Sequence, residues 1–130
     1  MAKGHDQHYE RLSQVAMLGK ELARRAKSKC ELCEGSEGKL TPFEVEPLPE
    51  EPTAESAVLL CSLCRDNIER GEYDHNRWRF LESSIWSDTP PVQVTAVRAC
   101  KSLSENGAGW AQDLLETVYL SPKVEEWLQK

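Results

Sequence analysis

The chain has 130 residues, of which 39% are hydrophobic and 29% charged, as in ordinary soluble globular proteins. Its formal net charge of −6 opposes nucleic-acid binding, which is normally the property of a basic domain. Residues 1–10 hold no apolar secretory region, and no apolar run approaches the roughly 20 residues that span a membrane. With five cysteines, an odd number, we therefore expect one cytoplasmic domain, 1–130, with no membrane partner.

Residues 6–28 have the periodicity of one amphipathic helix. Gly19 lies on its apolar stripe, where the missing side chain would let another element approach closely. The other residues of the stripe are Leu12, Val15, Leu22 and Ala26. We treat residues 1–29 as an N-terminal helical segment.

The C-terminal end of this segment is basic, and one Glu21 stands against five cations. The cations are Lys20, Arg24, Arg25, Lys27 and Lys29. The favoured explanation is a match to the negative end of the helix dipole. The alternative is a patch that binds nucleic acid or another anion.

Two pairs of thiols follow, Cys30-Glu-Leu-Cys33 and Cys61-Ser-Leu-Cys64, with 27 residues between the pairs. Each Cys-x-x-Cys turn can aim two sulfurs at one ion, and two such turns complete the tetrahedron that structural Zn²⁺ prefers. The spacing exceeds the usual 15–20 or so residues, but a longer loop costs only a few tenths of a kcal/mol to close. We predict one structural zinc ion bound by Cys30, Cys33, Cys61 and Cys64, with no position open for substrate.

The residues between and after the pairs predict a hairpin and a helix. Lys39–Val45 and Ala57–Leu60 can form two short strands, separated by an acidic, proline-rich loop at 46–56. Arg65–Arg70 reads as a helix that ends at Gly71. A turn, a hairpin, and a second pair at the start of a helix are typical of a zinc treble clef, which we assign to residues 30–71.

Residues 72–130 are expected to be helical. Asn76 can cap one helix, Thr89-Pro90 can start a second that ends at Asn106-Gly107, and Ser121-Pro122 can start the last. The apolar positions expected to pack are Trp78, Leu81, Ile85, Val92, Ala96, Ala99, Cys100, Leu103, Trp110, Leu114, Val118, Val124, Trp127 and Leu128. We expect Cys100 to be a small core residue. The predicted fold class is α-rich with a small β-hairpin, a treble clef flanked by an N-terminal helix and a C-terminal helical bundle.

A treble clef with two Cys-x-x-Cys pairs also frames one branch of the HNH nucleases, whose chemistry needs a His general base and a second metal. No His lies between Cys30 and Cys64, and the helix after Cys64 begins Arg65-Asp-Asn. We therefore predict no enzyme activity. A hard cation held by Glu44, Glu46, Asp66 and Asn67 is the remaining catalytic alternative. His75 reads as a loop residue, and His5 and His8 lie in a terminus expected to fray.

Several motifs together resemble the amino-terminal domain of proteobacterial PhnA-like proteins, which are named after an alkylphosphonate-utilisation operon. These motifs are the two thiol pairs, Asn76-Arg-Trp78, Ser84-Ile-Trp86-Ser, Pro91-Val-Gln-Val94 and Gly109-Trp-Ala-Gln-Asp-Leu-Leu115. The resemblance covers roughly residues 15–120. It implies a zinc domain that usually precedes a small β-barrel domain, which we do not expect within residues 1–130.

The function that these observations favour is a zinc-binding structural or protein-interaction module, linked to phosphonate metabolism by the family name only. One alternative is a nucleic-acid-binding zinc domain, in which further cations join the basic segment. Those cations are Arg65, Arg70, Arg77 and Arg79. The other alternative is an enzyme, either a degenerate HNH-type nuclease or one with phosphonate-related activity.

Overall fold

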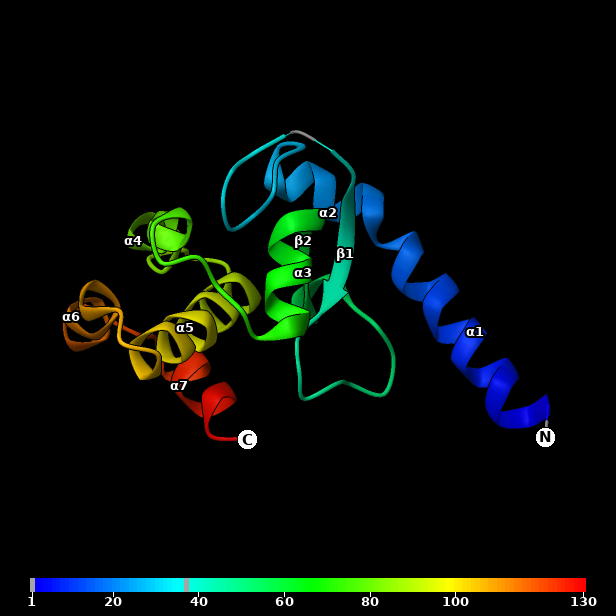
Figure 1. The fold of residues 1–130 in the computed structure, drawn as a ribbon. Helices are drawn as coiled ribbons and strands as arrows, with labels where there is room; N and C mark the ends of the chain where they lie inside the picture. The colour runs from blue at the N-terminus through cyan, green and yellow to red at the C-terminus, as the bar shows by residue number, and fades with distance from the viewer. Residues whose placement is uncertain (1, 37) are drawn as a thin grey trace.

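The computed structural model describes residues 2–36 and 38–130, with side chains from residue 9 onward. The elements in chain order are α1 (Ala2–Met17), α2 (Gly19–Ala26), β1 (Leu40–Glu44), η1 (Ala54–Ser56), β2 (Ala57–Cys61), α3 (Ser62–Arg70), η2 (Arg77–Phe80), α4 (Leu81–Ser84), α5 (Pro90–Glu105), α6 (Gly109–Thr117) and α7 (Pro122–Leu128). The fold is thus helix-rich with a small hairpin, which confirms the predicted fold class (Figure 1).

The N-terminal segment consists of two helices where the sequence predicted one. They meet at Leu18, and α1 extends away from the rest of the chain (Figure 1). The predicted apolar stripe is wrong at Leu12, which is 52% exposed, whereas Leu22 is buried. Gly19 has no atom within 4 Å of the place that a Cβ would occupy, so it serves no close approach. Only the second helix therefore contributes to a core.

Helix α2 ends where Lys27 and Ser28 both adopt a positive φ, and this turn leads the chain to the first cysteine pair. Leu22 packs beneath the helix in a small core of its own. Its buried companions there are Ala54, Ala57 and Leu59. The second helix is thereby fixed on one face of strand β2.

Strands β1 and β2 form a two-stranded antiparallel sheet, as predicted. Leu40 pairs with Cys61, and at the opposite end of the hairpin Glu44 pairs with Ala57. The cysteine pair therefore lies at the Leu40 end of the hairpin. Every residue of β2 is buried, because helices α2 and α5 both contact this strand. Helix α3 follows β2 directly and ends at Gly71, whose positive φ closes the helix as the sequence predicted.

The segment after α3 differs from the prediction at its cap. Asn76 makes no side-chain cap, and instead the Asp74 carboxylate accepts hydrogen bonds from the backbone N–H groups of Asn76 and Arg77. Asp74 thus starts the short helix η2. The expected continuous helix through Ile85 is an η2–α4 pair, in which Trp78, Leu81 and Ile85 are all buried.

Helix α5 is the central element of the helical part, and it contacts α4, α6, α7 and β2. It begins at Pro90 and ends before Asn106, as predicted. Buried residues occupy most of the circumference of α5, so its buried polar side chains need hydrogen-bond partners within the protein. The Gln93 amide donates to the Ile85 carbonyl at 2.7 Å, and the Thr95 hydroxyl donates to the Pro91 carbonyl at 2.7 Å.

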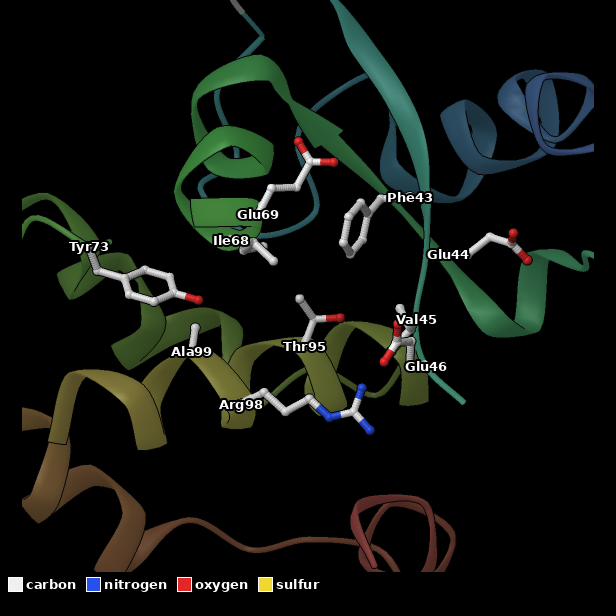
Figure 2. Close-up of a pocket in the computed structure, with 10 residues that line it drawn as sticks. All are labelled: Phe43, Glu44, Val45, Glu46, Ile68, Glu69, Tyr73, Thr95, Arg98 and Ala99. Carbon is white, nitrogen blue, oxygen red and sulfur yellow. The ribbon is translucent and has the colours of Figure 1, made fainter. Parts of the chain in front are cut away.

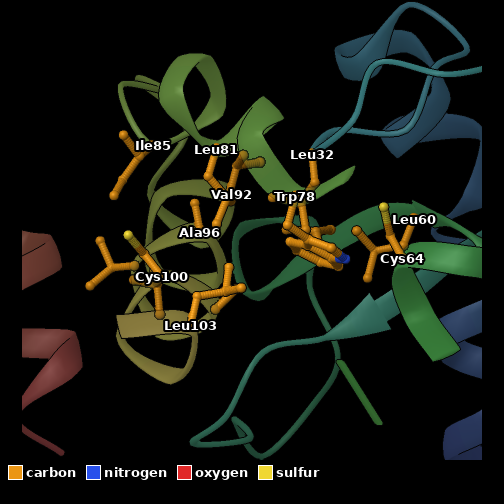
Figure 3. Close-up of a cluster of buried hydrophobic side chains, with 14 of the residues drawn as sticks. Leu32, Leu60, Cys64, Trp78, Leu81, Ile85, Val92, Ala96, Cys100 and Leu103 are labelled. Atoms are coloured by element: carbon orange, nitrogen blue, oxygen red, sulfur yellow. The ribbon is translucent and has the colours of Figure 1, made fainter. Parts of the chain in front are cut away.

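Trp78 connects the cysteine-bearing part to the helical part. Figure 3 shows its ring between a group containing Leu60 and Cys64 and a group containing Leu81 and Val92. Its indole N–H donates to the Asn67 side chain at 2.9 Å, so the buried ring has no unsatisfied polar atom. A further bridge spans the fold, because the Trp127 indole donates to the Glu46 carbonyl at 2.9 Å. Trp86, by contrast, is 48% exposed.

Within the described residues, no helix is long and apolar enough to cross a membrane.

Candidate metal centre

The four predicted cysteines lie together. Their Sγ atoms are all within 4.8 Å of one another, and no disulfide joins them. The Sγ atoms of Cys33 and Cys61 are 3.8 Å apart. A tetrahedron with metal–sulfur bonds of roughly 2.3 Å has edges of about 3.8 Å. The Cys33–Cys61 distance therefore matches one edge of such a tetrahedron, and all four sulfurs are close enough together to hold a single ion.

The first pair is held by a tight turn. The Glu34 N–H donates to the Cys30 carbonyl at 2.9 Å, and the Cys30 N–H donates to the Gly35 carbonyl at 2.8 Å. Glu34 adopts a positive φ of 63°, which turns the chain so that the Gly35 N–H reaches the Cys33 sulfur at 3.4 Å. A Cβ at position 35 would lie 3.3 Å from that sulfur, so glycine suits this position. The turn thus supplies both sulfurs and a donor to one of them.

The second pair spans the junction of strand and helix. Cys61 is the last residue of β2 and caps α3, because its sulfur accepts a hydrogen bond from the Cys64 N–H at 3.4 Å. Cys64 lies in the first turn of α3 and is fully buried. The start of a helix carries a partial positive charge, which stabilises thiolates there. The strand and the helix therefore position these two sulfurs without a flexible loop.

Glu31, one of the two residues between Cys30 and Cys33, anchors their turn to the sheet. The Glu31 N–H donates to the Leu59 carbonyl at 2.9 Å, and the Leu59 N–H donates to the Glu31 carboxylate at 2.8 Å. Arg25 pairs with the same carboxylate through two nitrogens, at 2.7 and 2.8 Å, and also donates to the Ala54 and Ala57 carbonyls. Helix α2, the cysteine turn and strand β2 are joined at this point.

Arg77 is a cation at the thiol cluster. Its guanidinium donates to the Cys64 sulfur at 3.4 Å and lies 4.0 Å from the Cys61 sulfur. It is held over the Phe80 ring, 5.5 Å from the centroid, and also reaches the Asn67 side chain at 3.4 Å. Four thiolates around a divalent ion leave two negative charges in excess, so an adjacent guanidinium stabilises the loaded site.

Hydrogen bonds and burial shift the pKa values of Cys30, Cys33 and Cys64 in different directions. A hydrogen bond from Cys64 lowers the pKa of Cys30 to about 4, whereas burial raises the pKa of Cys33 to about 11. The same bond to Cys30 raises the pKa of Cys64. A metal that binds all four sulfurs as thiolates must displace the protons of Cys33 and Cys64 at neutral pH. Metal affinity at this site therefore falls as the solution is acidified.

The set considered for a hard cation is not brought together. The Glu44 carboxylate is paired with Arg11, and Asp66 is paired with Arg70. Asn67 accepts from the Trp78 indole. Across the part of the chain that the structure describes, the four cysteines form the single group of three or more His, Cys, Asp or Glu side chains arranged to hold a metal ion.

The basic residues named for nucleic-acid binding have different environments. Arg25 and Arg77 are engaged as described above, and Arg65 donates to the Thr41 hydroxyl at 3.0 Å. Arg70 and Arg79 form exposed ion pairs within their own segments. Four cations of the predicted patch are exposed: Lys20, Arg24, Lys27 and Lys29. The patch is therefore smaller than the sequence indicated.

Cys100 lies away from the cluster in the core, as predicted, and its thiol donates to the Ala111 carbonyl at 3.3 Å. His75 is an exposed loop residue. Helix α1 includes positions 5 and 8, but the side chains of His5 and His8 lie outside the described part.

Sequence reasoning missed the roles of Glu31 and Arg77. Glu31 occupies a variable position of Cys-x-x-Cys, where any exposed polar residue would be acceptable. Its side chain is nonetheless only 6% exposed. Arg77 is 13 residues from Cys64, and no periodicity links the two. Glu31 and Arg77 each meet their partners only when separate segments of the chain fold onto each other, and local sequence patterns do not encode such contacts.

Comparison of the chain with protein-family models, curated proteins and solved structures found no match.

Proposed function

We propose that this chain is a zinc-binding structural module that presents a surface to a protein partner, of the PhnA-like type that its motifs resemble. The observation that carries the proposal is the cluster of four sulfur atoms within 4.8 Å of one another. Thiolates are soft ligands that select zinc among the divalent metals suited to a tetrahedral four-sulfur site. All four ligand positions are protein sulfurs, so the ion has a role in folding and none in substrate binding.

The order of the ligand-bearing elements supports a zinc treble clef. A tight turn carries Cys30 and Cys33, the β1–β2 hairpin follows, and Cys61 and Cys64 lie where the strand becomes helix α3. In this arrangement the ion joins the turn to the helix start. Trp78 and Arg77 pack against that junction from the helical part, so the ion stabilises both parts of the chain.

A non-enzymatic role is part of the proposal. The strand that carries the general base in HNH nucleases has Phe43-Glu-Val here, and the following helix begins Ser62-Leu-Cys-Arg65. The carboxylates considered for a second metal are paired with arginines, at Glu44 and Asp66. The sequence of this strand and helix and these two ion pairs therefore support a role without water activation.

The experiment that tests the proposal is stepwise metal addition to chain stripped of metal by chelator under reducing conditions. Co²⁺ should give the intense thiolate-to-metal absorption of a tetrahedral four-sulfur site, and one equivalent of Zn²⁺ should remove it. Full folded structure, monitored by near-ultraviolet circular dichroism of buried Trp78, should return at the same equivalence point. Spectra of an octahedral ion, or cleavage of plasmid DNA that requires added Mg²⁺, would contradict the proposal.

A further inference from the structure

A pocket of about 290 Å³ lies between strand β1, helix α3 and helix α5 (Figure 2). Phe43 and Glu44 belong to it, and they lie at the end of the hairpin where Glu44 pairs with Ala57. Cys61 is at the opposite end, paired with Leu40. The pocket is therefore separate from the cysteine cluster, and the proposed zinc role does not use it.

The middle of the pocket is apolar. Figure 2 shows the Phe43 ring and Ile68 on one side, facing Thr95 and Ala99 of α5 on the other. The Thr95 hydroxyl is buried and already donates within its own helix. This volume is at the lower limit of small-molecule sites, which are concave, apolar and carry a few polar groups that fix orientation.

Arg98 supplies a cation at one edge of the pocket. Its side chain is half-buried, and burial lowers its pKa. Among residues 9–36 and 38–130 it forms no hydrogen bond and no ion pair within 4 Å, although Glu46 acts on it electrostatically. A partly desolvated guanidinium that makes no direct hydrogen bond is costly, and an arginine fork matches a carboxylate in two-point fashion.

Glu46 supplies an anion at the same edge. Its side chain has no partner in the described part of the chain, because Trp127 bonds only its backbone carbonyl. The other two acids of the pocket are neutralised by bases outside it: Glu44 by Arg11, and Glu69 by Arg65. In Figure 2 the Glu44 carboxylate lies across strand β1, away from the pocket. Arg98 and Glu46 thus attract each other across the mouth of the pocket, but no ion pair within 4 Å fixes either side chain in the described part of the chain.

At the other edge, the Tyr73 hydroxyl points into the pocket (Figure 2). Its ring is fixed edge-on against Trp78, with centroids 4.7 Å apart. The hydroxyl has no hydrogen-bond partner among the described residues, and burial raises its pKa, so it is a neutral donor at physiological pH. The pocket therefore has a charged edge, an apolar middle and a hydroxyl at the far edge.

We propose that this pocket binds a small zwitterion, a free α-amino acid with an apolar side chain. Its carboxylate pairs with Arg98, its ammonium pairs with Glu46, and its side chain extends over Phe43 and Ile68 toward Tyr73. A simple carboxylate would satisfy Arg98 and leave Glu46 repelling it, whereas a simple amine would satisfy Glu46 and face the unpaired Arg98. A zwitterion satisfies both charges and adds none to the acidic chain.

The test uses the zinc-loaded chain and three probes of similar shape: L-phenylalanine, 3-phenylpropionate, which lacks the ammonium, and phenethylamine, which lacks the carboxylate. Backbone amide chemical shifts are followed during each titration. L-phenylalanine should bind saturably with a dissociation constant below about 1 mM, shifting the amides of Ile68, Thr95 and Ala99. Each of the other probes should bind at least about tenfold more weakly.

Variants separate the two charges. Arg98→Gln should weaken L-phenylalanine binding at least about tenfold, and Glu46→Gln should do the same while leaving 3-phenylpropionate no weaker. Lys101→Gln, an exposed change on the same helix, is the matched control and should bind as the unchanged chain does. Melting points and zinc content identify any variant that fails to fold. Because Glu46 is exposed, its variant keeps the test decisive even if Arg98→Gln is unstable.

Three results would overturn the inference. The first is no saturable binding of L-phenylalanine. The second is equal affinity for either single-charge probe. The third is unchanged affinity in a folded Glu46→Gln variant. None of these results depends on whether the zinc proposal holds, since zinc content is measured separately.

Discussion

The Arg25 guanidinium and the Glu31 carboxylate form a two-point ion pair, with Nε–Oε2 and Nη2–Oε1 distances of 2.8 and 2.7 Å. The pair joins helix α2 to the turn that carries Cys30 and Cys33. Arg25 is 25% exposed and Glu31 only 6%, so the pair is largely removed from water. Arg25, which the sequence placed in a basic patch, therefore connects helix α2 to the candidate metal centre.

Arg25→Gln should lower the free energy of unfolding by about 3 kcal/mol, because it leaves a nearly buried carboxylate without its partner. Arg24→Gln, the neighbouring exposed change, should shift stability by no more than about 0.5 kcal/mol. Urea unfolding of both zinc-loaded variants measures the difference. Equal midpoints for the two variants would show that the Arg25 pair contributes nothing to the fold.

The loss of Arg25 and Arg77 from the basic patch changes how nucleic-acid binding should be tested. Changing Arg25 would lower stability as well as charge, so the exposed residues Lys20, Arg24, Lys27 and Lys29 are the ones to reverse to Glu. We expect no salt-sensitive binding of single- or double-stranded oligonucleotides by the unchanged chain, because it is acidic overall. Fluorescence titrations at low and moderate salt measure this. Micromolar binding that weakens steeply with salt and disappears in the four-residue variant would establish the alternative function.

Arg77 should tune metal affinity. Arg77→Gln removes a cation that lies 3.4 Å from the Cys64 sulfur, and should weaken zinc binding about tenfold, the lower end of the effect of removing a hydrogen-bonded neighbour of a ligand. Arg70→Gln is the control, because Arg70 is exposed and pairs only with Asp66. Competition with a chromophoric chelator gives both affinities. An unchanged affinity in Arg77→Gln would mean that the guanidinium serves packing alone.

The Cys100 thiol should make stability fall in alkaline solution. Burial raises its pKa from 9.0 to about 11 in the folded chain. Below pH 9 the thiol is protonated in both folded and unfolded chains, so it has no effect. Between pH 9 and about 11 the unfolded chain ionises first, so the folded state loses stability as pH rises.

The measurement is the difference in unfolding free energy between the unchanged chain and Cys100→Ala, at pH 8 and at pH 10.5 or so. The advantage of the unchanged chain should narrow at the higher pH, because alanine does not titrate. Other titrating groups are common to both chains and cancel. A constant difference would show that the thiol is not shielded from solvent.

The sequence was informative wherever a local rule governs structure. Thr89-Pro90 and Asn106-Gly107 mark the ends of α5, and Ser121-Pro122 marks the start of α7, with the Ser121 hydroxyl accepting the Val124 N–H at 3.3 Å. Proline at the first position of a helix and glycine just after its end are favoured by the local backbone, so these signals can be read from a few consecutive residues. Each Cys-x-x-Cys turn is likewise set by four consecutive residues, so both pairs could be recognised in the sequence.

Sequence patterns failed where a distant segment decides. The apolar residues of 6–28 do recur at helical spacing, but Leu12 is 52% exposed, whereas Leu22 is buried in a small core with Ala57 and Leu59 of β2. Asn76 and Asp74 are both good helix caps, and the backbone angles at the turn selected Asp74. The contact between Trp127 and the Glu46 carbonyl, 81 residues apart, could not be read from any local pattern.

We propose that Cys30, Cys33, Cys61 and Cys64 hold one zinc ion on which the fold depends. Removing one ligand, as in Cys61→Ser, should cost most of the roughly 10–16 kcal/mol that structural zinc contributes in small domains, whereas Cys100→Ser should cost no more than a core substitution, about 2–3 kcal/mol. The most direct measurement is native mass spectrometry of the reduced chain together with these two variants. We expect one zinc ion in the folded unchanged chain and in Cys100→Ser, and a metal-free, largely unfolded Cys61→Ser. A folded chain without metal, or a disulfide within either cysteine pair, would contradict the claim.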